Sequence, residues 1–140
     1  MGQLVFNDKA RVGAWVASRV DQQSDWGASF YAMGAEREGE LVSGIVMSDY
    51  NGSNALVHIA VDKSGKDLIA LFQAFARYAF LQLQLNRLTG LVPSNRPDVL
   101  KFDLKIGFEQ EFLMPKAARG GHDMHILVMW HDKCPWLKGL

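Results

Sequence analysis

The chain has 140 residues and carries 15 Lys and Arg against 15 Asp and Glu, so its formal net charge is zero. This length is typical of a single compact domain, and the balanced charge excludes a bulk electrostatic attraction to DNA, RNA or an anionic membrane. A single cysteine, Cys134, excludes an intrachain disulfide, and no apolar run approaches membrane-spanning length. The first residues lack the basic and apolar regions of a signal peptide, so we expect a cytoplasmic protein.

The N-terminal part of the sequence predicts one helix and a set of strands joined by turns. In chain order we expect a strand over residues 3–6, a helix from 7 or 8 to about 20, and strands over 28–35, 41–49 and 54–61. Glu38-Gly39-Glu40 predicts a tight turn, and Asn51-Gly52 is the strongest hairpin signal in the chain. The last three strands should therefore form an antiparallel meander.

A long helix should follow, from Lys66 to about Leu85. Its apolar side chains recur at steps of three and four residues: Leu68, Leu71, Phe72, Phe75, Ala79, Phe80 and Leu83. Ile69 and Leu81 widen this stripe, so we expect most of the helix circumference to be buried. Ser64 and Asp67 have the spacing of a capping box, and the free backbone N–H groups at such a helix start can bind an anion.

The C-terminal part predicts a buried strand over residues 87–93, parallel to the strand before the long helix. A helix should begin at Arg96-Pro97-Asp98 and end at Gly107, because Pro is favoured in a first turn and Gly after a last one. Strands over 108–114 and 122–130 complete the order β-α-βββ-α-β-α-ββ. We therefore expect one α/β domain over residues 1–140, with a mixed sheet, helices on both faces and a short tail from 130 onward.

A family resemblance lies in residues 87–112, where a strand, Asn95, a short helix and Lys105-Ile106-Gly107-Phe108 follow one another. With the element order, this segment resembles the GCN5-related N-acetyltransferase family over essentially the whole chain. The chain is most similar to the branch with ribosomal-protein and small phage-encoded acetyltransferases, and residues 129–137 are similar to tails of the phage group. The resemblance implies a bacterial or phage-infected host cell.

The resemblance implies transfer of an acetyl group from acetyl-coenzyme A to an amine of a small molecule or a peptide, without a metal. In such proteins the strand before the long helix splays from the strand after it, and the pantetheine arm enters the gap. A backbone N–H there polarises the thioester carbonyl. The implied cofactor-binding residues are Ile59, Ala60 and Val61 on the strand, Ser64, Gly65, Lys66, Asp67 and Leu68 at the pyrophosphate, and Asn95 beside the pantetheine arm. A homodimer is compatible with this family.

The sequence departs from the family pattern at two positions. The loop over residues 62–67 has one glycine, and Asp67 adds a negative charge at the pyrophosphate position that Lys63 and Lys66 can offset. Asp103 stands where many members have a Tyr that protonates the leaving thiolate. An exposed Asp is ionised at neutral pH and is a poor acid, so we expect catalysis mainly by positioning. These departures keep open a non-catalytic protein on the same fold, such as a phage assembly or host-interaction module.

The general base has several candidates. His58 lies on the central strand and titrates in the right range for catalysis, but a hydrogen-bonded core histidine is the competing interpretation. Asp49 and Tyr50 at the end of the preceding strand are alternatives, with turn formation as their structural role.

A competing zinc chemistry rests on His122, His125, His131 and Cys134. All four residue types can bind zinc, but residues 122 and 125 point to opposite faces of a strand. We therefore expect scattered strand and surface residues and no metal site.

Overall fold

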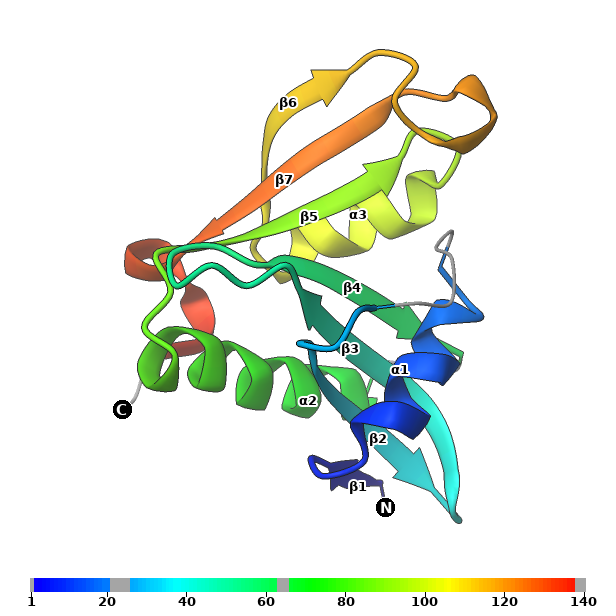
Figure 1. Cartoon of the computed structure of the whole chain (residues 1–140), viewed down its shortest axis with the longest axis vertical. Coiled ribbons are helices and arrows are strands. Elements are labelled where there is room, and N and C mark those ends of the chain that lie inside the picture. Colours follow the sequence, from blue (N-terminus) through cyan, green and yellow to red (C-terminus); the bar gives the residue numbers. More distant parts are fainter. Residues whose placement is uncertain (1, 21–25, 63–65, 138–140) are drawn as a thin grey trace.

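The computed structural model describes residues 2–20, 26–62 and 66–137, and within them a seven-stranded mixed sheet with the order β1-β2-β3-β4-β5-β7-β6 (Figure 1). The strands are β1 (Gln3–Val5), β2 (Tyr31–Arg37), β3 (Glu40–Ser48), β4 (Leu56–Val61), β5 (Arg87–Pro93), β6 (Glu109–Met114) and β7 (Met124–Trp130). The helices are α1 (Lys9–Ala17), α2 (Lys66–Arg77) and α3 (Pro97–Ile106). A π-helical turn, η1 (Tyr78–Gln82), extends α2, and short 3-10 turns are η2 (Arg119–Gly121), η3 (His131–Lys133) and η4 (Pro135–Leu137).

The predicted fold class and element order are confirmed. None of the described helices is long and apolar enough to cross a membrane.

The two turns of the meander differ in kind. Glu38 and Gly39 both have positive φ angles, 54° and 82°, which matches the right-handed twist of β2 and β3 and confirms the predicted tight turn. The Asn51-Gly52 signal lies instead in a longer loop over residues 49–55. There the Asn51 Oδ1 atom accepts hydrogen bonds from the backbone N–H groups of Ser53 and Asn54, at 3.0 and 2.8 Å. The side chain thus shapes a wide connection between antiparallel strands.

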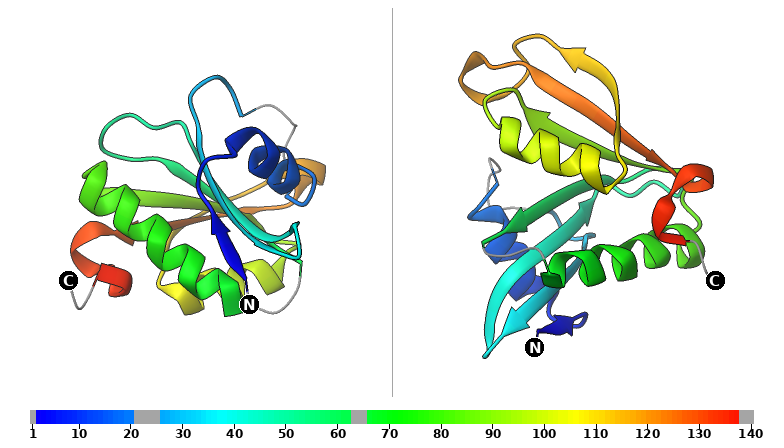
Figure 2. Two further views of the ribbon diagram at one scale, coloured as in Figure 1. Left: turned by 90° about the horizontal axis from the view of Figure 1, so that it is seen from below. Right: turned by 180° about the vertical axis from the view of Figure 1, so that it is seen from behind.

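The helices cover the two faces of the sheet unequally (Figure 2). α1 lies on one face, where Val12 and Val16 pack on Ala32, Val46 and Ala60. α2 and α3 lie on the other face and enclose the larger core, which includes Phe72, Phe75, Phe80, Ile45, Met47 and Ile106. Two layers of helices therefore hold the central strand β4 from both sides.

The expectation that most of the long helix is buried is wrong. Ile69 and Leu81 are 43% and 47% exposed, whereas Leu68, Leu71 and Phe72 on the sheet side are fully buried. The reason is that the helix packs on the sheet and, through Phe72 and Trp136, on the C-terminal turn η4, whereas its remaining side faces solvent. Periodicity locates the buried stripe but does not set its width.

The parallel pair β4–β5 is joined at one end and open at the other. The register includes only Leu56↔Thr89 and Val57↔Gly90, and in Figure 1 the two strands diverge from this point. The joined end is fastened by the Thr89 backbone N–H, which donates to the Ala55 carbonyl at 2.9 Å, and by the Thr89 hydroxyl, which donates to Asn54 Oδ1 at 2.7 Å. Along residues 58–61, β4 keeps β3 as its ladder partner but has no β5 residue opposite. The sheet is therefore split beside its central strand.

The close approach of α1 to the sheet yields a stability prediction. A Cβ atom on Gly44 of β3 would lie 2.7 Å from Val16 Cγ2 and 3.3 Å from Val12 Cγ1. Both valines are buried and stiff, so we expect Gly44→Ala to lower the free energy of unfolding by about 1–3 kcal/mol in urea denaturation. The matched control is Gly90→Ala on β5, where the nearest atom would be 3.6 Å away. Equal stabilities of the two variants would contradict the packing described for α1.

Candidate active site

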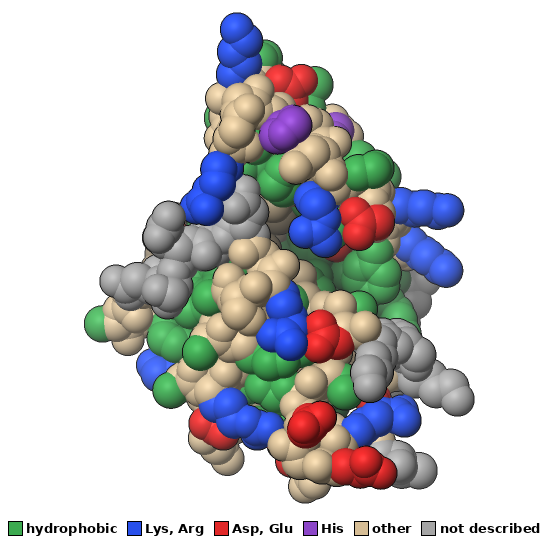
Figure 3. Space-filling view, turned by 90° about the vertical axis from the view of Figure 1, so that its right-hand side faces the viewer, with side chains coloured by type: hydrophobic (Ala, Val, Ile, Leu, Met, Phe, Trp, Pro, Cys, Tyr) green, Lys and Arg blue, Asp and Glu red, His purple; other side chains and the backbone are tan. Residues whose placement is uncertain are grey.

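A cavity of about 320 Å³ occupies the open end of the β4–β5 split. Its walls come from β4, β5, α3, the start of α2 and the turn after α1. On the face shown in Figure 3 the surface is hollowed between the upper and lower parts of the molecule, and hydrophobic side chains line the hollow. Predicted residues that line the cavity are His58, Ile59, Ala60, Val61, Leu68 and Asp103. The split thus brings residues from β4 and α3 to one place.

Asp103 corrects the expectation of an exposed, ionised carboxylate. Its side chain is only 6% exposed, because α3 turns this residue inward toward the split. Burial raises the pKa of the carboxyl to about 7, since desolvation disfavours the charged form. The Oδ1 atom is buried and has no hydrogen-bond partner among the described residues. Asp103 is therefore a carboxyl group that can be protonated at neutral pH and that has an unused hydrogen-bonding atom.

His58 lies at the other side of the central strand. Burial lowers its pKa to about 4, against a smaller opposing effect of Asp49, so the ring is neutral at pH 7 rather than titrating there. The ring packs against Trp26 with 4.6 Å between centroids. Its Nε2 atom lies 3.1 Å from the Ser48 hydroxyl, which in turn donates to Asp49 Oδ2 at 3.2 Å. Because that hydroxyl has one hydrogen, it accepts from Nε2–H, which leaves Nδ1 with the free lone pair.

The two titratable groups approach the split from opposite faces. Ile59, with its neighbour Val57, belongs to the core under α2 and α3, and Asp103 lies on α3 at this face. His58 instead contacts Trp26, which packs with the core under α1. The open stretch of β4 thus lies between an acid on one face and a neutral imidazole on the other.

The expected pyrophosphate site is described only in part. Ser64 and Gly65 lie outside the described residues, as does Lys63, so the capping box and the loop remain predictions. Lys66 is the first residue of α2, and Leu68 lines the cavity. Asp67 forms an ion pair with Arg37 of β2, whose Nε lies 2.6 Å from Asp67 Oδ2. The sequence does not predict this pairing with Arg37, whose positive charge offsets the negative charge that Asp67 brings to the helix start.

Asn95 does not line the cavity. It lies exposed in the turn between β5 and α3. Its contact with a pantetheine arm therefore stays a prediction, because Asn95 is not among the residues that line the cavity. The adjacent Arg96 does line the cavity, and its Nε lies 3.4 Å from Asp98 Oδ1.

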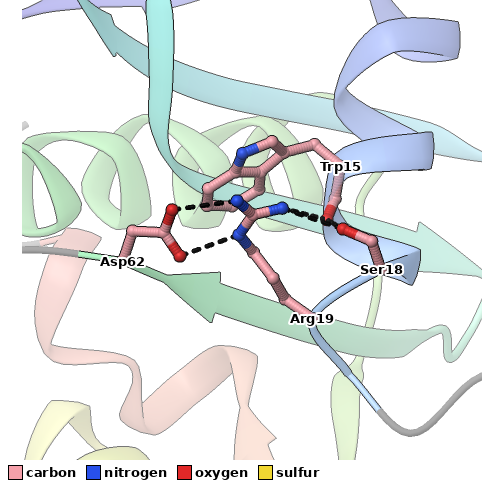
Figure 4. A network of polar contacts seen from close by, with 4 residues as sticks. All are labelled: Trp15, Ser18, Arg19 and Asp62. Carbon is pink, nitrogen blue, oxygen red and sulfur yellow. Dashed lines mark hydrogen bonds and ion pairs between the residues drawn. The ribbon is translucent and has the colours of Figure 1, made fainter.

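Arg19, which lines the cavity, belongs to a network of polar contacts with Trp15, Ser18 and Asp62 (Figure 4). Arg19, in the turn after α1, donates from Nε and Nη2 to the two oxygens of Asp62, at 2.7 and 3.0 Å. The guanidinium also stacks over the Trp15 ring at 4.0 Å and donates to Ser18 Oγ at 2.8 Å. This bidentate pair ties the end of α1 to the residue after β4, and the flat guanidinium is held in one orientation.

The zinc alternative is not supported among the described residues. All four candidates are described, and no group of three or more His, Cys, Asp or Glu in the described part of the chain could hold a metal ion. The His131 ring stacks on Phe80 and its Nδ1 lies 3.0 Å from the Leu85 carbonyl. Cys134 is buried, and burial raises the pKa of its thiol. These side chains pack the C-terminal turns against the core.

Comparisons with known proteins agree with this geometry at the level of the fold. No protein-family model and no curated protein matches the chain in sequence. Solved structures do match: a mutant of spermidine N-acetyltransferase SpeG from Vibrio cholerae has a TM-score of 0.77 at 13% identity, over 99% of this chain and 96% of that one. The same enzyme in complex with CoA and spermine gives 0.74 at 12% identity, over 94% and 96%. A chimera of this enzyme with hSSAT gives 0.73 at 13% identity, over 98% of each chain.

These identities show the fold alone. The chain has the mixed α/β fold of N-acetyltransferases of the GCN5-related type, as the sequence resemblance implied.

Three residues of the candidate site are not predicted from the sequence. Arg19 and Arg96 line the cavity, and the Ser48 hydroxyl lies 3.1 Å from His58 Nε2. The sequence signal for Ser48 is weak: it is a polar residue at the end of an apolar strand, and the next strand, which pairs with it, carries His58. Arg19 and Arg96 carry no local signal, because their roles depend on which loops the fold brings to the rim.

The burial of Asp103 predicts a distinct pH dependence of stability. An unfolded Asp titrates near its ordinary pKa of 3.8, whereas the folded carboxyl titrates at about 7. The folded state therefore binds the proton more tightly, and the free energy of unfolding falls as pH rises from about 4 to about 7. Asp103→Asn removes this contribution, so the difference between wild type and variant should change by up to about 4 kcal/mol across the window in urea titrations.

The control is Asp98→Asn at the exposed start of the same helix. Arg96 lowers the pKa of Asp98 through a hydrogen bond, so any contribution has the opposite sign and is lost as pH falls. Parallel stability curves for wild type and Asp103→Asn across the window would contradict the buried, proton-binding carboxyl.

Proposed function

We propose that the chain is an acetyl-coenzyme A-dependent N-acetyltransferase that acts on an amine of a small molecule or a peptide. The single observation that supports this most is the split between β4 and β5, with Asp103 and His58 on its two faces. The polypeptide edge over residues 58–61 has no β5 residue opposite, so its outward backbone groups are available to a ligand. A pantetheine arm is a chain of amide groups that can pair with such an edge.

The residues present fit acetyl-coenzyme A as a co-substrate. Ile59, Ala60 and Val61 line the cavity with their strand edge unpaired toward β5, and Leu68 adds apolar lining at the start of α2. The unpartnered Oδ1 of Asp103 gives the cavity one buried polar atom for which a ligand atom is the natural partner. Ser64, Gly65, Lys66 and Asp67 remain the proposed pyrophosphate residues, and Asn95 the proposed contact to the pantetheine arm.

In this proposal Asp103 is the acid. The amine nitrogen forms a bond to the thioester carbonyl carbon, the carbon–sulfur bond breaks, and the sulfur leaves with the bond electrons. A protonated Asp103 donates its proton to that sulfur. The transfer is favourable because a carboxyl pKa of about 7 lies below the ordinary thiol value of about 8.5. The expectation that a carboxylate at this position is too ionised to help rests on exposure, which the buried side chain does not have.

His58 is the proposed acceptor of the amine proton. Its ring is neutral at pH 7, and the lone pair on Nδ1 is free when Nε2–H donates to Ser48. Once the ring is charged, Asp49 stabilises the cation through the Ser48 hydroxyl. Because the protonated ring has a pKa of about 4, the neutral ring is too weak a base to deprotonate a free ammonium ion. His58 therefore works on the nitrogen after it has attacked, when that nitrogen is more acidic.

Two further features of the assignment are proposed from the sequence resemblance: the branch with ribosomal-protein and phage-encoded acetyltransferases, and a homodimer as the assembly. The cytoplasm is the proposed compartment. The non-catalytic alternative was favoured by the departures at Asp67 and Asp103. The ion pair of Asp67 with Arg37 and the raised pKa of Asp103 weaken both arguments for it.

The location of the co-substrate can be tested by filling the split. Val61 lines the cavity and is 44% exposed, so Val61→Trp should fold while its indole occupies the gap. We expect acetyl-coenzyme A binding, measured by isothermal titration calorimetry, to weaken by at least about tenfold, because a bulky side chain cannot be accommodated in a close-packed site. The control is Leu104→Trp on α3, 42% exposed and outside the cavity lining. Equal affinities of the two folded variants would remove the split as the binding site.

The acid role predicts a kinetic loss in Asp103→Asn with retained affinity for acetyl-coenzyme A. General-acid help is typically worth about 10²–10⁴-fold, so turnover should fall by that order near neutral pH, and the basic limb near pH 7 should vanish from the rate profile. Turnover is followed with acceptors that include spermine and a peptide N-terminus. Asp132→Asn, which removes an exposed carboxylate outside the cavity lining, is the control and should change turnover little. His58→Gln should show a smaller loss without altering that basic limb. A wild-type profile in Asp103→Asn would assign the acid elsewhere.

A further inference from the structure

A second and larger cavity, of about 1000 Å³, lies on another part of the molecule. It runs between β2 and the end of α2 with η1, and it shares no described lining residue with the cavity in the split. We call it the α2–β2 groove; its lining residues used below are Phe6, Lys9, Phe30, Arg77, Tyr78 and Leu81. The groove is thus a separate place where a ligand can bind, and the proposed acetyl transfer leaves it unused.

Arg77, in the last turn of α2, gives the groove a partly buried cation. Its Nε atom is buried and has no hydrogen-bond partner among the described residues. A guanidinium stays charged at every physiological pH, so it cannot reduce the cost of desolvation by losing a proton. Removing a charged donor from water without a partner costs free energy that an anionic acceptor would offset. The side chain therefore defines a place for a ligand carboxylate.

The rest of the lining has the same sign. Lys9, at the start of α1, lies 4.9 Å over the Phe30 ring, with its Nζ 3.5 Å from the Phe30 carbonyl. No Asp or Glu is among the described residues that line the groove. Lys9 and Arg77 thus give this part of a chain with zero net charge a local excess of positive charge.

The wall of the groove is built by an uncommon backbone feature. Residues 78–82 form a π-helical turn, which adds a residue to the helix repeat and is frequent at functional sites. This turn places Tyr78 and Leu81 in the lining of the groove. The ring centroids of Tyr78 and Tyr31 lie 5.6 Å apart. Burial raises the pKa of Tyr78, so its phenol stays protonated and can donate a hydrogen bond. Phe6 and Leu81 contribute exposed apolar surface.

We propose that the α2–β2 groove binds a small organic acid, with its carboxylate at Arg77 and an aromatic body against Phe6, Phe30 and Leu81. The cations select the charge, and the aromatic and aliphatic side chains select the flat apolar body. This site is independent of acetyl transfer, because the two cavities have no lining residue in common.

The test uses 2-naphthoate as the probe and isothermal titration calorimetry on the whole chain. We expect saturable binding of 2-naphthoate that is not displaced by acetyl-coenzyme A. The neutral analogue 2-naphthylmethanol should bind at least about tenfold more weakly, because it lacks a charge-assisted bond to Arg77. Arg77→Gln should reduce the affinity for 2-naphthoate by a similar factor and should also reduce its salt dependence. Lys133→Gln, an exposed charge removal at η3, is the matched control and should leave binding unchanged.

A second pair of variants locates the apolar body. Leu81→Trp should fill the groove and abolish 2-naphthoate binding, whereas Ile69→Trp, on an exposed position of the same helix, should not. The proposal is overturned if 2-naphthoate does not bind, if the alcohol binds equally well, if Arg77→Gln and Lys133→Gln behave alike, or if acetyl-coenzyme A displaces the probe. It is also overturned if sedimentation shows a dimer that Leu81→Trp dissociates, since the groove is then an interface between copies.

Discussion

The boundary between β4 and β5 is fastened at one end and open at the other, and this asymmetry decides what the molecule can hold. At the fastened end the Ser53 carbonyl accepts from the Asn86 and Arg87 N–H groups, and the Thr89 N–H bonds to Ala55. Beyond Val57 no β5 residue pairs with β4. Backbone groups that a continuous sheet would satisfy internally must find water or a ligand there. A peptide-like substrate arm has the right complement of donors and acceptors for that edge.

The packing of α1, α2 and α3 keeps the open end from collapsing. Two helices support one face and α1 supports the other, so β4 is held in place although it has no β5 neighbour over residues 58–61. The same burial gives the split its chemistry. Desolvation disfavours the charged form of each group. It therefore raises the pKa of Asp103 and lowers the pKa of His58. Near pH 7 the ring is neutral and the carboxyl is partly so, and these two groups therefore add little fixed charge to the cavity.

Much of the fold was predictable because its elements carry strong local signals. The 87–93 strand, the helix that begins at Pro97 and ends before Gly107, and the Glu38-Gly39 turn follow from apolar runs, a first-turn proline and positive-φ residues. The site was less predictable, because burial is a property of the assembled fold. A single Asp in a helix reads as exposed, and nothing near Asp103 in the sequence announces that α3 turns it inward. Partners such as Arg37 for Asp67 lie far apart along the chain and meet only through the sheet.

Cys134 has a practical consequence for measuring acetyl transfer. Release of free coenzyme A is followed by the reaction of its thiol with a disulfide reagent, and a reactive protein thiol would contribute a background. The chain has one cysteine, it is buried in the turns after β7, and burial raises its pKa, so little thiolate is present to react. The folded protein should therefore be silent toward such a reagent, and a rising thiol signal without substrate would report unfolding of the C-terminal turns.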